Sequence, residues 1–273
     1  MVAFQGELGA FTHDAIYKLA GRRIPLLPLA SFHDVFEALQ TGKAGFAAVP
    51  IENTLHGSVH ENYDHLLEFN FHVIGETSLR ISHQLIALPG TRWRDVRRVF
   101  SHPVALNQCR MFFRKYPHLE AVPFYDTAGS VKMLREEQPA QAAAIASQTA
   151  AAIYGGAILR RGIEDDRRNF TRFFLLSKKN TVGKRTRAPW KTSLVFSMPN
   201  TPGSLFRAMA CFALRDLNLT KIESRPLRGK PWEYLFYVDF WGAITDAAVR
   251  NALANLAELT DSLKVLGCYQ PTP

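Results

Sequence analysis

Residues 44–59 read AGFAAVPIENTLHGSV, an apolar run that ends in a carboxylate, an amide and a hydroxyl. The apolar part, 45–51, predicts a buried strand, because short runs of small and branched apolar residues are typical of strands covered on both faces. Glu52, Asn53 and Thr54 follow at its carboxyl end, and Ser58 is placed to cap a helix. An ordinary capped loop explains these residues as well as a functional site does, so the segment first indicates a strand, a loop and a helix.

The same alternation continues on both sides of this stretch. Short apolar runs predict eight further strands, at 2–5, 26–29, 72–79, 85–88, 97–101, 121–124, 143–146 and 171–177. Amphipathic stretches between them predict helices, with caps expected at Ser31, Thr127 and Ser147. Strands that alternate with helices predict βαβ units and a doubly wound, largely parallel sheet, which binds ligands beyond the carboxyl ends of its strands.

The chain divides near residue 180. With 273 residues it is long for one domain of roughly 100–200 residues, so two domains are expected. Residues 178–191 read KKNTVGKRTRAPWK, with six basic side chains, no acid and no apolar periodicity, which predicts a linker. The following elements are then expected: a strand at 192–198, a helix at 203–214, a hairpin of 219–224 and 234–240 around 228–231, a helix at 245–259 and a strand at 262–269. The order β-α-β-β-α-β is ferredoxin-like.

The distribution of charge along the sequence bears on whether the protein binds nucleic acid. The formal net charge is +9, but six of these charges fall in 178–191, which leaves +3 for the rest of the chain. Binding of nucleic acid needs positive charge clustered on a folded surface. The segment RWRDVRR at 92–98 mixes cations with an aromatic ring, but Asp95 and the short strand after it favour an exposed loop. We therefore expect no nucleic-acid partner.

Cysteine usage and the N-terminal residues predict a cytoplasmic protein. Cys109, Cys211 and Cys268 form no CxxC pair, which argues against a disulfide framework and fits a reducing compartment. The first residues lack the basic and apolar regions of a signal peptide. No run approaches the roughly 20 apolar residues that cross a bilayer, so no membrane partner is expected.

Three further segments place polar or glycine-rich residues where predicted strands end or begin. FQGELGAF at 4–11 has two glycines three apart before a helix whose N-terminus could bind an anion, although a tight turn explains it too. SHPVALNQC at 101–109 predicts a helix capped by Ser101 or His102, with Pro103 in its first turn. NFTRF at 169–173 begins the last strand before the linker. Each segment alone is explained by local structure.

Together, in order and spacing, the four segments resemble the prephenate dehydratase family with a C-terminal ACT domain. The resemblance rests on the opening glycine turn, on VPIENTLHG at 49–57, on SHPVALNQC and on TRF at 171–173. In the second half, PGSLF at 202–206 and ESRP at 223–226 match the ACT pattern of this family. The resemblance covers essentially the whole chain.

The resemblance implies a fold with three parts. Residues 1–177 would form a two-lobed, doubly wound α/β catalytic region with a cleft like that of periplasmic binding proteins, the first lobe from 1–77 plus 171–177 and the second from 78–166. After the basic linker at 178–191, residues 192–273 would form a ferredoxin-like βαββαβ ACT domain. The family implies a homodimer or homotetramer joined through both kinds of domain.

The implied activity is that of a carbon–oxygen lyase (a hydro-lyase) of phenylalanine biosynthesis. The enzyme expels CO₂ and water from prephenate to give phenylpyruvate, and it needs no metal or organic cofactor. Arogenate dehydratase, which performs the same elimination on an amino-acid side chain, stays open as an alternative. A non-catalytic amino-acid-sensing protein would also suit a two-lobed cleft, but the complete Thr171–Phe173 and Glu52–Thr54 sets favour an enzyme.

The resemblance also assigns roles in the catalytic region. Thr171 matches the family's essential threonine; because its hydroxyl is a very weak acid, we expect it to donate a hydrogen bond to the leaving hydroxyl. Glu52 is the ionisable candidate behind it, if burial lets it hold a proton, and Asn53 is the third catalytic candidate. The expected substrate-binding residues are Gly6, Thr54, Gly57, Ser101, Gln108, Arg172 and Phe173.

For regulation, the resemblance implies that L-phenylalanine binds between the ACT domains of paired subunits. One side of the pocket would be a helix N-terminus suited to a carboxylate, formed by Asn200, Gly203, Ser204 and Leu205. The other side would be formed by Asn218, Leu219, Glu223, Ser224 and Arg225. Ser204 stands where alanine is commoner in the family.

A metal site is the remaining alternative. His56, His60 and His65 lie near Glu52 and Glu61, and His56 and His60 are one helical turn apart. No third ligand is evident from the spacing, so we interpret the histidines as a polar helix face and expect no metal.

Overall fold

The computed structural model describes residues 1–180, 188–227, 229 and 232–272. Two compact units are evident from the contacts between residues: Met1–Phe69 with Thr77–Leu175, and Asn70–Glu76 with Leu176–Pro273. Part of the predicted linker, 181–187, and three residues of the predicted hairpin turn, 228, 230 and 231, lie outside the described residues.

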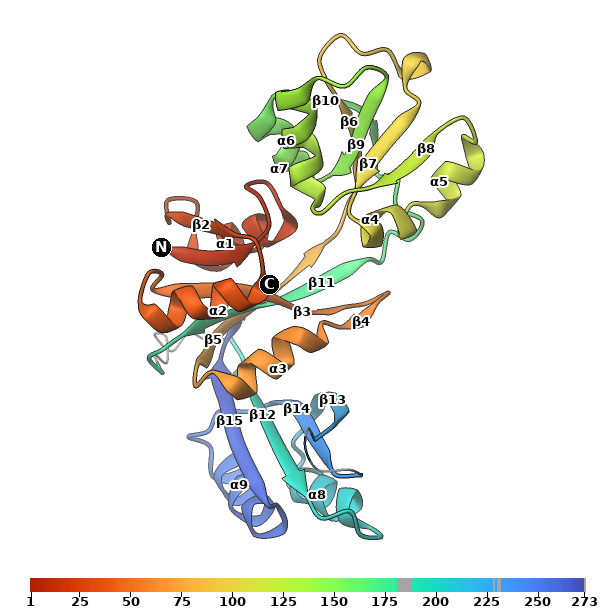
Figure 1. Ribbon diagram of the computed structural model, residues 1–273. Helices are drawn as coiled ribbons and strands as arrows, with labels where there is room; N and C mark the ends of the chain where they lie inside the picture. Colours follow the sequence, from red (N-terminus) through yellow and green to blue (C-terminus); the bar gives the residue numbers. More distant parts are fainter. Residues whose placement is uncertain (181–187, 228, 230–231, 273) are drawn as a thin grey trace. The chain divides into compact units, whose positions relative to one another are not determined.

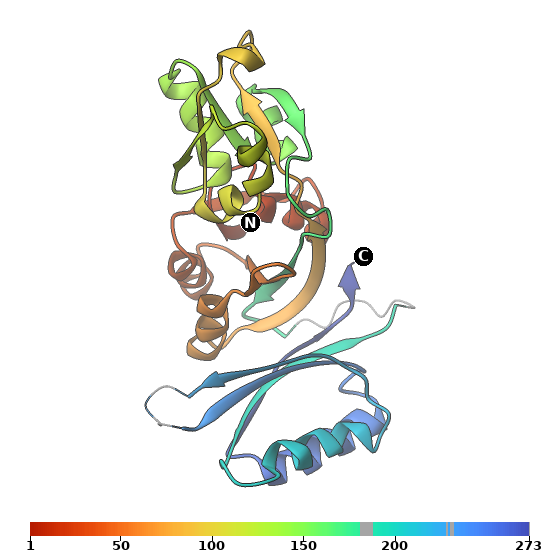
Figure 2. The same cartoon turned by 90° about the vertical axis from the view of Figure 1, so that its right-hand side faces the viewer.

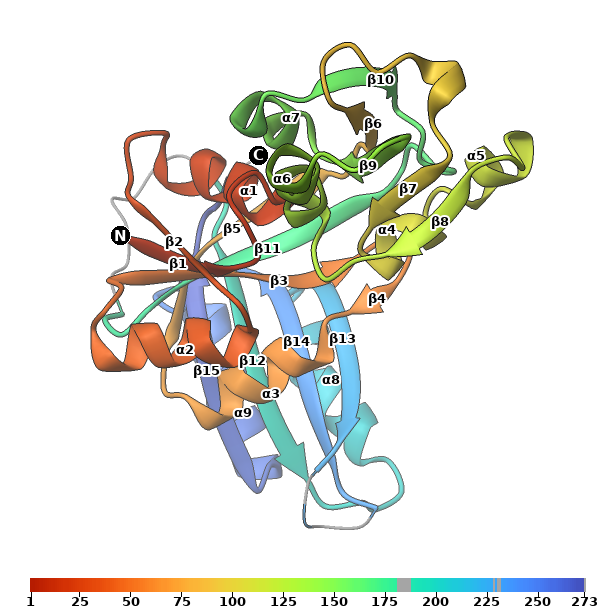
Figure 3. The same ribbon diagram turned by 45° about the horizontal axis from the view of Figure 1, so that its top comes forward.

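The first unit contains two sheets, one in each lobe (Figure 1). The first lobe has the strand order β5 (His72–Arg80), β11 (Phe170–Ser177), β3 (Phe46–Asn53), β1 (Val2–Gln5) and β2 (Leu26–Leu29). Strand β1 pairs in parallel with both β2 and β3, as Figure 3 shows, which confirms the predicted parallel core. The short strand β4 (Gly57–Ser58) folds back antiparallel on the end of β3. The helices of this lobe are α1 (Phe11–Ala20), α2 (Phe32–Thr41) and α3 (His60–Glu68).

The second lobe is built around a five-stranded sheet. Its order is β10 (Ala157–Arg161), β6 (Gln84–Ala87), β9 (Ala142–Ala146), β7 (Arg98–Ser101) and β8 (Glu120–Pro123). Strands β7, β8 and β9 are parallel, whereas β6 runs antiparallel to β9 and β10. Its helical segments are η1 (Trp93–Asp95), α4 (Pro103–Asn107), α5 (Arg110–Lys115), α6 (Thr127–Glu137) and α7 (Gln148–Tyr154). Buried apolar residues of the sheet and helices, Cys109 among them, form its core.

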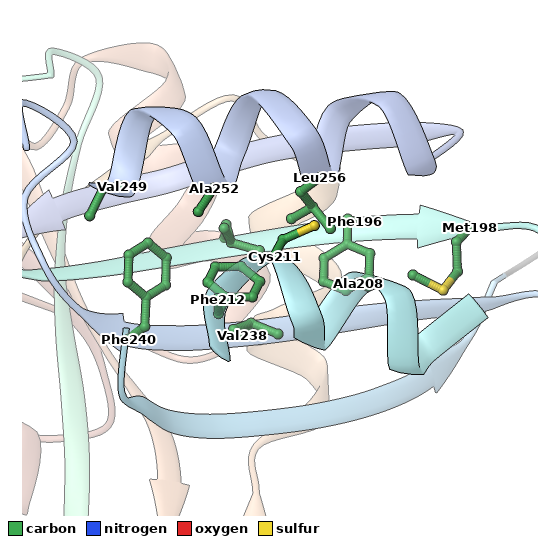
Figure 4. Close-up of a cluster of buried hydrophobic side chains, with 11 residues drawn as sticks. Phe196, Met198, Ala208, Cys211, Phe212, Val238, Phe240, Val249, Ala252 and Leu256 are labelled. Carbon is green, nitrogen blue, oxygen red and sulfur yellow. The ribbon is translucent and has the colours of Figure 1, made fainter. Parts of the chain in front are cut away.

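The C-terminal part of the second unit has the predicted ferredoxin-like order. The strands lie in the order β13 (Leu219–Pro226), β14 (Tyr234–Trp241), β12 (Lys191–Met198) and β15 (Ser262–Tyr269), all antiparallel. Helices α8 (Ser204–Ala213) and α9 (Ala247–Leu259) lie on the same face of this sheet (Figure 2). Phe196, Phe212, Phe240 and Leu256 meet in the layer between them (Figure 4). The predicted fold class is confirmed.

Residues 70–76 belong to this second unit, although we expected them in the first lobe. The two-residue strand β16 (Pro271–Thr272) pairs with β5, and Gly267 lies so close to Val73 that a Cβ there would be 2.0 Å from the Val73 carbonyl oxygen. No side chain other than hydrogen fits at that approach.

A buried ion pair fixes the same segment. Lys191 Nζ lies 2.9 and 3.2 Å from the two carboxylate oxygens of Glu76, and the Tyr269 hydroxyl donates to Glu76 at 2.9 Å. Glu76 and Lys191 are each only 6% exposed. Buried charges are tolerated when they are paired and hydrogen-bonded, as here. Lys191, which we expected at the end of the linker, is therefore the first residue of β12.

Several helix starts differ from prediction. The cap at Ser31 is confirmed, as a capping box with Asp34, and so is the cap at Ser147. Ser58 does not cap a helix: it pairs with Glu52 in β4, and α3 begins after Val59. For α6 the N-cap is an aspartate one residue before the predicted threonine. Strand β10 was not predicted, because its five residues include two arginines at one end and directly follow a glycine pair.

Candidate active site

Asn53 holds Thr171 in place where two strands of the first lobe lie side by side. Its Nδ2 group donates to Thr171 Oγ1 at 2.9 Å, to Asn169 Oδ1 at 2.7 Å and to the Phe170 carbonyl at 3.1 Å. Its Oδ1 atom accepts from the backbone N–H groups two and three residues later, each at 3.0 Å. The Thr171 hydroxyl accepts from Asn53, so its own proton remains available for another acceptor.

A cleft of about 290 Å³ lies beside this threonine and is lined by both lobes. Five of the ten predicted catalytic-region residues line it: Asn53, Gly57, Gln108, Thr171 and Phe173. The first turn of α1 lines it as well, through Phe11 and Thr12. Since the first N–H groups of a helix lack partners within the helix, this turn can bind an anion, as the sequence suggested.

Glu52 and Arg172 lie outside the cleft, contrary to our prediction. Successive residues of a strand point to opposite sides, so Asn53 and Thr171 face the cleft and their neighbours do not. Arg172 Nη1 lies 3.5 Å from Glu52 Oε2, and its guanidinium lies 4.8 Å from the Phe174 ring centroid. Glu52 is therefore paired with a cation and does not line the cleft.

Two more predicted substrate-binding residues have structural roles instead. Ser101 is fully buried and donates to the Ile145 carbonyl at 2.6 Å within the second sheet. Thr54 donates to the Arg168 carbonyl at 2.8 Å and accepts from the Phe170 N–H group at 3.0 Å. These hydroxyls are already used, so neither is available to a ligand as predicted.

Gly6 brings the two lobes together and does not bind through its N–H group, which donates to the Leu29 carbonyl at 2.9 Å. Its φ is +105°, and a Cβ at this position would lie 2.8 Å from Asp126 Oδ2 of the second lobe. Nearby, the Ser147 hydroxyl donates to the Gly9 carbonyl at 2.6 Å. The glycine turn is thus one of the places where the first lobe contacts the second.

Asp126 is an ionisable residue of the cleft that we did not predict. It is 7% exposed, and its Oδ1 atom caps α6 by accepting from the Gly129 N–H group at 2.7 Å. Burial raises the pKa of this carboxyl, although hydrogen bonds from the N–H groups of Gly129 and Glu7 oppose the rise. The sequence does contain a signal for Asp126: it is an aspartate that follows shortly after a predicted parallel strand and precedes a predicted helix. We predicted Thr127 as the cap of that helix.

His83, Gln108 and His56 form a second polar group in the cleft. His83 Nε2 lies 2.6 Å from Gln108 Oε1, and Gln108 Nε2 lies 3.2 Å from His56 Nδ1. The backbone N–H of His83 donates to Glu164 at 2.9 Å. Burial lowers the pKa of His83, and the Gln108 hydrogen bond and the Glu164 charge oppose this only partly. No spacing in the sequence links these three side chains.

His102 confirms the expected start of α4. Its Nδ1 atom accepts from the Val104 N–H group at 3.2 Å, and Pro103 occupies the first turn. Burial lowers the pKa of His102, while the nearby Asp126 carboxylate acts in the opposite direction. This imidazole also lines the cleft.

The ferredoxin-like unit has a hollow of its own, of about 180 Å³, at the start of α8. The predicted effector residues that line it are Asn200, Gly203, Ser204 and Leu205. The other five do not line it. They lie on or just before the edge strand β13, which pairs with β14: Asn218, Leu219, Glu223, Ser224 and Arg225. Within the described residues of one chain, one predicted side of the effector site lines the hollow, and Ser224 of the other side lies opposite Phe236, which lines it.

A model of the prephenate dehydratase family matches residues 2–181, which include every part of the cleft. The chain belongs to the prephenate dehydratase family. The matched residues include the glycine turn, Asn53, Gln108 and the strand that carries Thr171.

Individual relatives cover the whole chain. It is 45% identical to arogenate dehydratase/prephenate dehydratase 2 (chloroplastic) of Arabidopsis thaliana, across 98% of this chain and 72% of that protein. A solved prephenate dehydratase from Arthrobacter aurescens, in complex with L-Phe, is 32% identical with a TM-score of 0.89, covering 98% of this chain and 89% of that one. A structure described as GqqA, a novel type of quorum quenching acylase, is 33% identical with a TM-score of 0.90, covering 100% and 98%.

Neither a metal centre nor a membrane-spanning helix is evident in the part of the chain that the structure describes. Among these residues, no group of three or more His, Cys, Asp or Glu side chains is placed to hold a metal ion. Within the same residues, no helix is both long enough and apolar enough to span a membrane. His65, one of the three histidines considered as ligands, packs against Phe36 and Phe69.

Proposed function

We propose that the chain converts prephenate to phenylpyruvate, CO₂ and water. The electron pair of the bond to the ring carboxylate enters the ring as the carbon–oxygen bond to the hydroxyl breaks. The hydroxyl leaves as water, so the prephenate dianion takes up one proton. The observation that carries the proposal is Thr171, held by Asn53 in a cleft between two lobes with its hydroxyl proton uncommitted.

The proton must come from a group stronger than a threonine hydroxyl. Asp126 lines the same cleft, and because burial raises its pKa it holds a proton at higher pH than an exposed aspartate does. We assign Asp126 as the proton source and Thr171 as the hydrogen-bond donor that orients and stabilises the departing hydroxyl. Glu52 has no part in this scheme.

The rest of the cleft wall suits the binding of one substrate carboxylate and the loss of the other. The N–H groups at the start of α1, near Phe11 and Thr12, suit one substrate carboxylate. Phe173, Ile81 and Val59 add apolar wall, where a desolvated carboxylate loses CO₂ more readily.

Arogenate is the second candidate substrate, because its ring is that of prephenate and only the side chain differs. Purified protein assayed with each substrate separately should accelerate loss of the ring hydroxyl from at least one. Comparison of kcat/KM for the two decides between prephenate and arogenate. No acceleration of either substrate would contradict the enzyme function and leave a binding protein.

Acyl transfer is a further possibility only because one solved relative is described as an acylase. A serine or threonine nucleophile needs a base at hydrogen-bond distance. In the described residues, the contact of the Thr171 hydroxyl is with the Asn53 amide, which is not a base, and the nearby imidazole of His83 is bonded to Gln108. The elimination is therefore the function that the geometry supports better.

We further propose that the C-terminal unit is an ACT regulatory domain that binds L-phenylalanine between paired chains, in a homodimer or homotetramer. The hollow at the start of α8 supports one half of the site. β13 is an edge strand in the described chain, and Ile222 on it is 47% exposed, which suits pairing with a second copy. Such pairing would bring the residues of β13 to the hollow of the other chain.

The reducing environment expected from the sequence is retained in this proposal. Cys109, Cys211 and Cys268 are all unpaired and buried. Free buried thiols fit a cytoplasmic enzyme, in which glutathione keeps cysteines reduced.

Ser204→Tyr should abolish or strongly weaken the response to L-phenylalanine while basal turnover persists. The added ring would occupy the hollow beside Leu205, far in sequence from the catalytic residues. Ala247→Tyr is the matched control, because Ala247 is the first residue of α9 as Ser204 is of α8, and it is exposed. Titration of activity with L-phenylalanine is the measurement; an unchanged response in Ser204→Tyr would contradict the effector site.

A further inference from the structure

His83 is almost completely enclosed and yet forms part of the cleft wall. It is 1% exposed, it precedes β6, and its ring lies edge-on to Phe11 with centroids 5.5 Å apart. Both rings line the cleft. A buried imidazole at such a place needs partners for both of its nitrogen atoms.

The hydrogen bonds of Gln108 fix the tautomer of this ring. The Gln108 amide nitrogen, which can only donate, lies 3.2 Å from His56 Nδ1. The amide oxygen, which can only accept, therefore faces His83 Nε2 at 2.6 Å, and that nitrogen carries the proton. Because burial lowers the pKa of His83, the ring is neutral and its Nδ1 atom is a hydrogen-bond acceptor.

Nδ1 has no hydrogen-bond partner among the described residues. A buried acceptor without a partner costs free energy, and a ligand that supplies a donor removes this cost on binding. The cleft that His83 lines is the one proposed for the substrate.

We infer that His83 Nδ1 accepts a hydrogen bond from the bound substrate and thereby positions it beside Thr171. This rests on the proposed function. Two donors are available: the ring hydroxyl, which prephenate and arogenate share, and the ammonium group, which arogenate alone carries. Gln108 contributes by holding the tautomer that leaves Nδ1 as an acceptor.

Two substitutions separate the nitrogen atoms of His83. In His83→Gln the side-chain amide reaches the position of Nε2, so it can still bond Gln108 but offers nothing at Nδ1. In His83→Asn the shorter amide offers its oxygen at the position of Nδ1 and leaves Gln108 without its partner. Steady-state kinetics on both substrates, with thermal unfolding of each variant, compares the two.

His83→Gln should lower kcat/KM by at least tenfold, and His83→Asn should restore part of the loss. Equal losses for both substrates identify the ring hydroxyl as the donor; a loss confined to arogenate identifies the ammonium group. His65→Gln, which changes a largely buried histidine outside the cleft, should leave kcat/KM unchanged for both substrates.

Three results overturn the inference. If the unsubstituted chain turns over neither substrate, the proposed function fails and the inference with it. If the unsubstituted chain is active and His83→Gln has the same kcat/KM on both substrates, the proposed role of His83 is wrong and the proposed function still holds. If His83→Asn is as impaired as His83→Gln, an acceptor at the position of Nδ1 restores nothing, and the role of Nδ1 fails.

Discussion

Thr171→Val is expected to lower kcat by about 10²- to 10⁴-fold while the protein stays folded, which is the range for losing a group that stabilises a transition state or transfers its proton. Valine has nearly the shape of threonine but no hydroxyl, so it removes the donor to the departing hydroxyl. Asn53 would keep its bonds to Asn169 and Phe170, so the local strands should hold. Single-turnover and steady-state rates with the preferred substrate measure the effect.

Thr171→Ser is the matched control, because it keeps the hydroxyl and loses only a methyl group. It should retain much more activity than the valine variant, and both should unfold near the temperature of the unsubstituted chain. Near-normal turnover in Thr171→Val would remove this residue from the mechanism, whatever its position in the cleft.

Asp126→Asn should lower kcat by about 10²- to 10⁴-fold, the usual contribution of a general acid. Asparagine can still accept from the Gly129 N–H group and cap α6, so the fold should survive. The protonated form of Asp126 is the donor; activity is therefore present below the raised pKa of this carboxyl and is lost as the pH rises through it. The variant should lack this alkaline limb in its kcat–pH profile.

Asp34→Asn is a suitable control, since it also changes a carboxylate that accepts a backbone N–H hydrogen bond at the start of a helix but lies outside the cleft. It should leave both kcat and the pH profile unchanged. If instead Glu52→Gln removed the alkaline limb and Asp126→Asn did not, the proton source would be Glu52, as the sequence alone suggested.

The sequence predicted which segments meet in the site better than which side chains face the cleft. Asn53 and Thr171 line the cleft, whereas Glu52, predicted as the ionisable group, and Arg172, predicted as a substrate-binding residue, do not. Strand β3 runs on to Asn53, two residues beyond its predicted end, and the alternation of a strand then turns Glu52 away. A predicted strand that extended to Asn53 would have placed Glu52 and Asn53 on opposite faces of the sheet.

Other site residues depend on contacts that no local pattern encodes. Asp126 faces the cleft because Gly6, 120 positions earlier, lets the two lobes approach, and His83 is fixed by a glutamine from another helix end. The elements themselves were predicted well: the strands at 2–5, 26–29 and 262–269 have the observed bounds, since apolar periodicity and caps are local signals. Strand β4 was missed because two residues carry no periodicity.

The Glu76–Lys191 pair makes the two parts of the chain poor candidates for exchange as modules. A break anywhere in the basic segment after residue 177 would separate Glu76 from Lys191 and Tyr269, leaving a carboxylate built for burial, and Val73 beside it, without the strands that cover them. Removing one partner of a buried pair is far more damaging than never having had the pair. Residues 70–76 therefore group with the C-terminal part of the chain, so a division at residue 177 alone would not separate the two compact units.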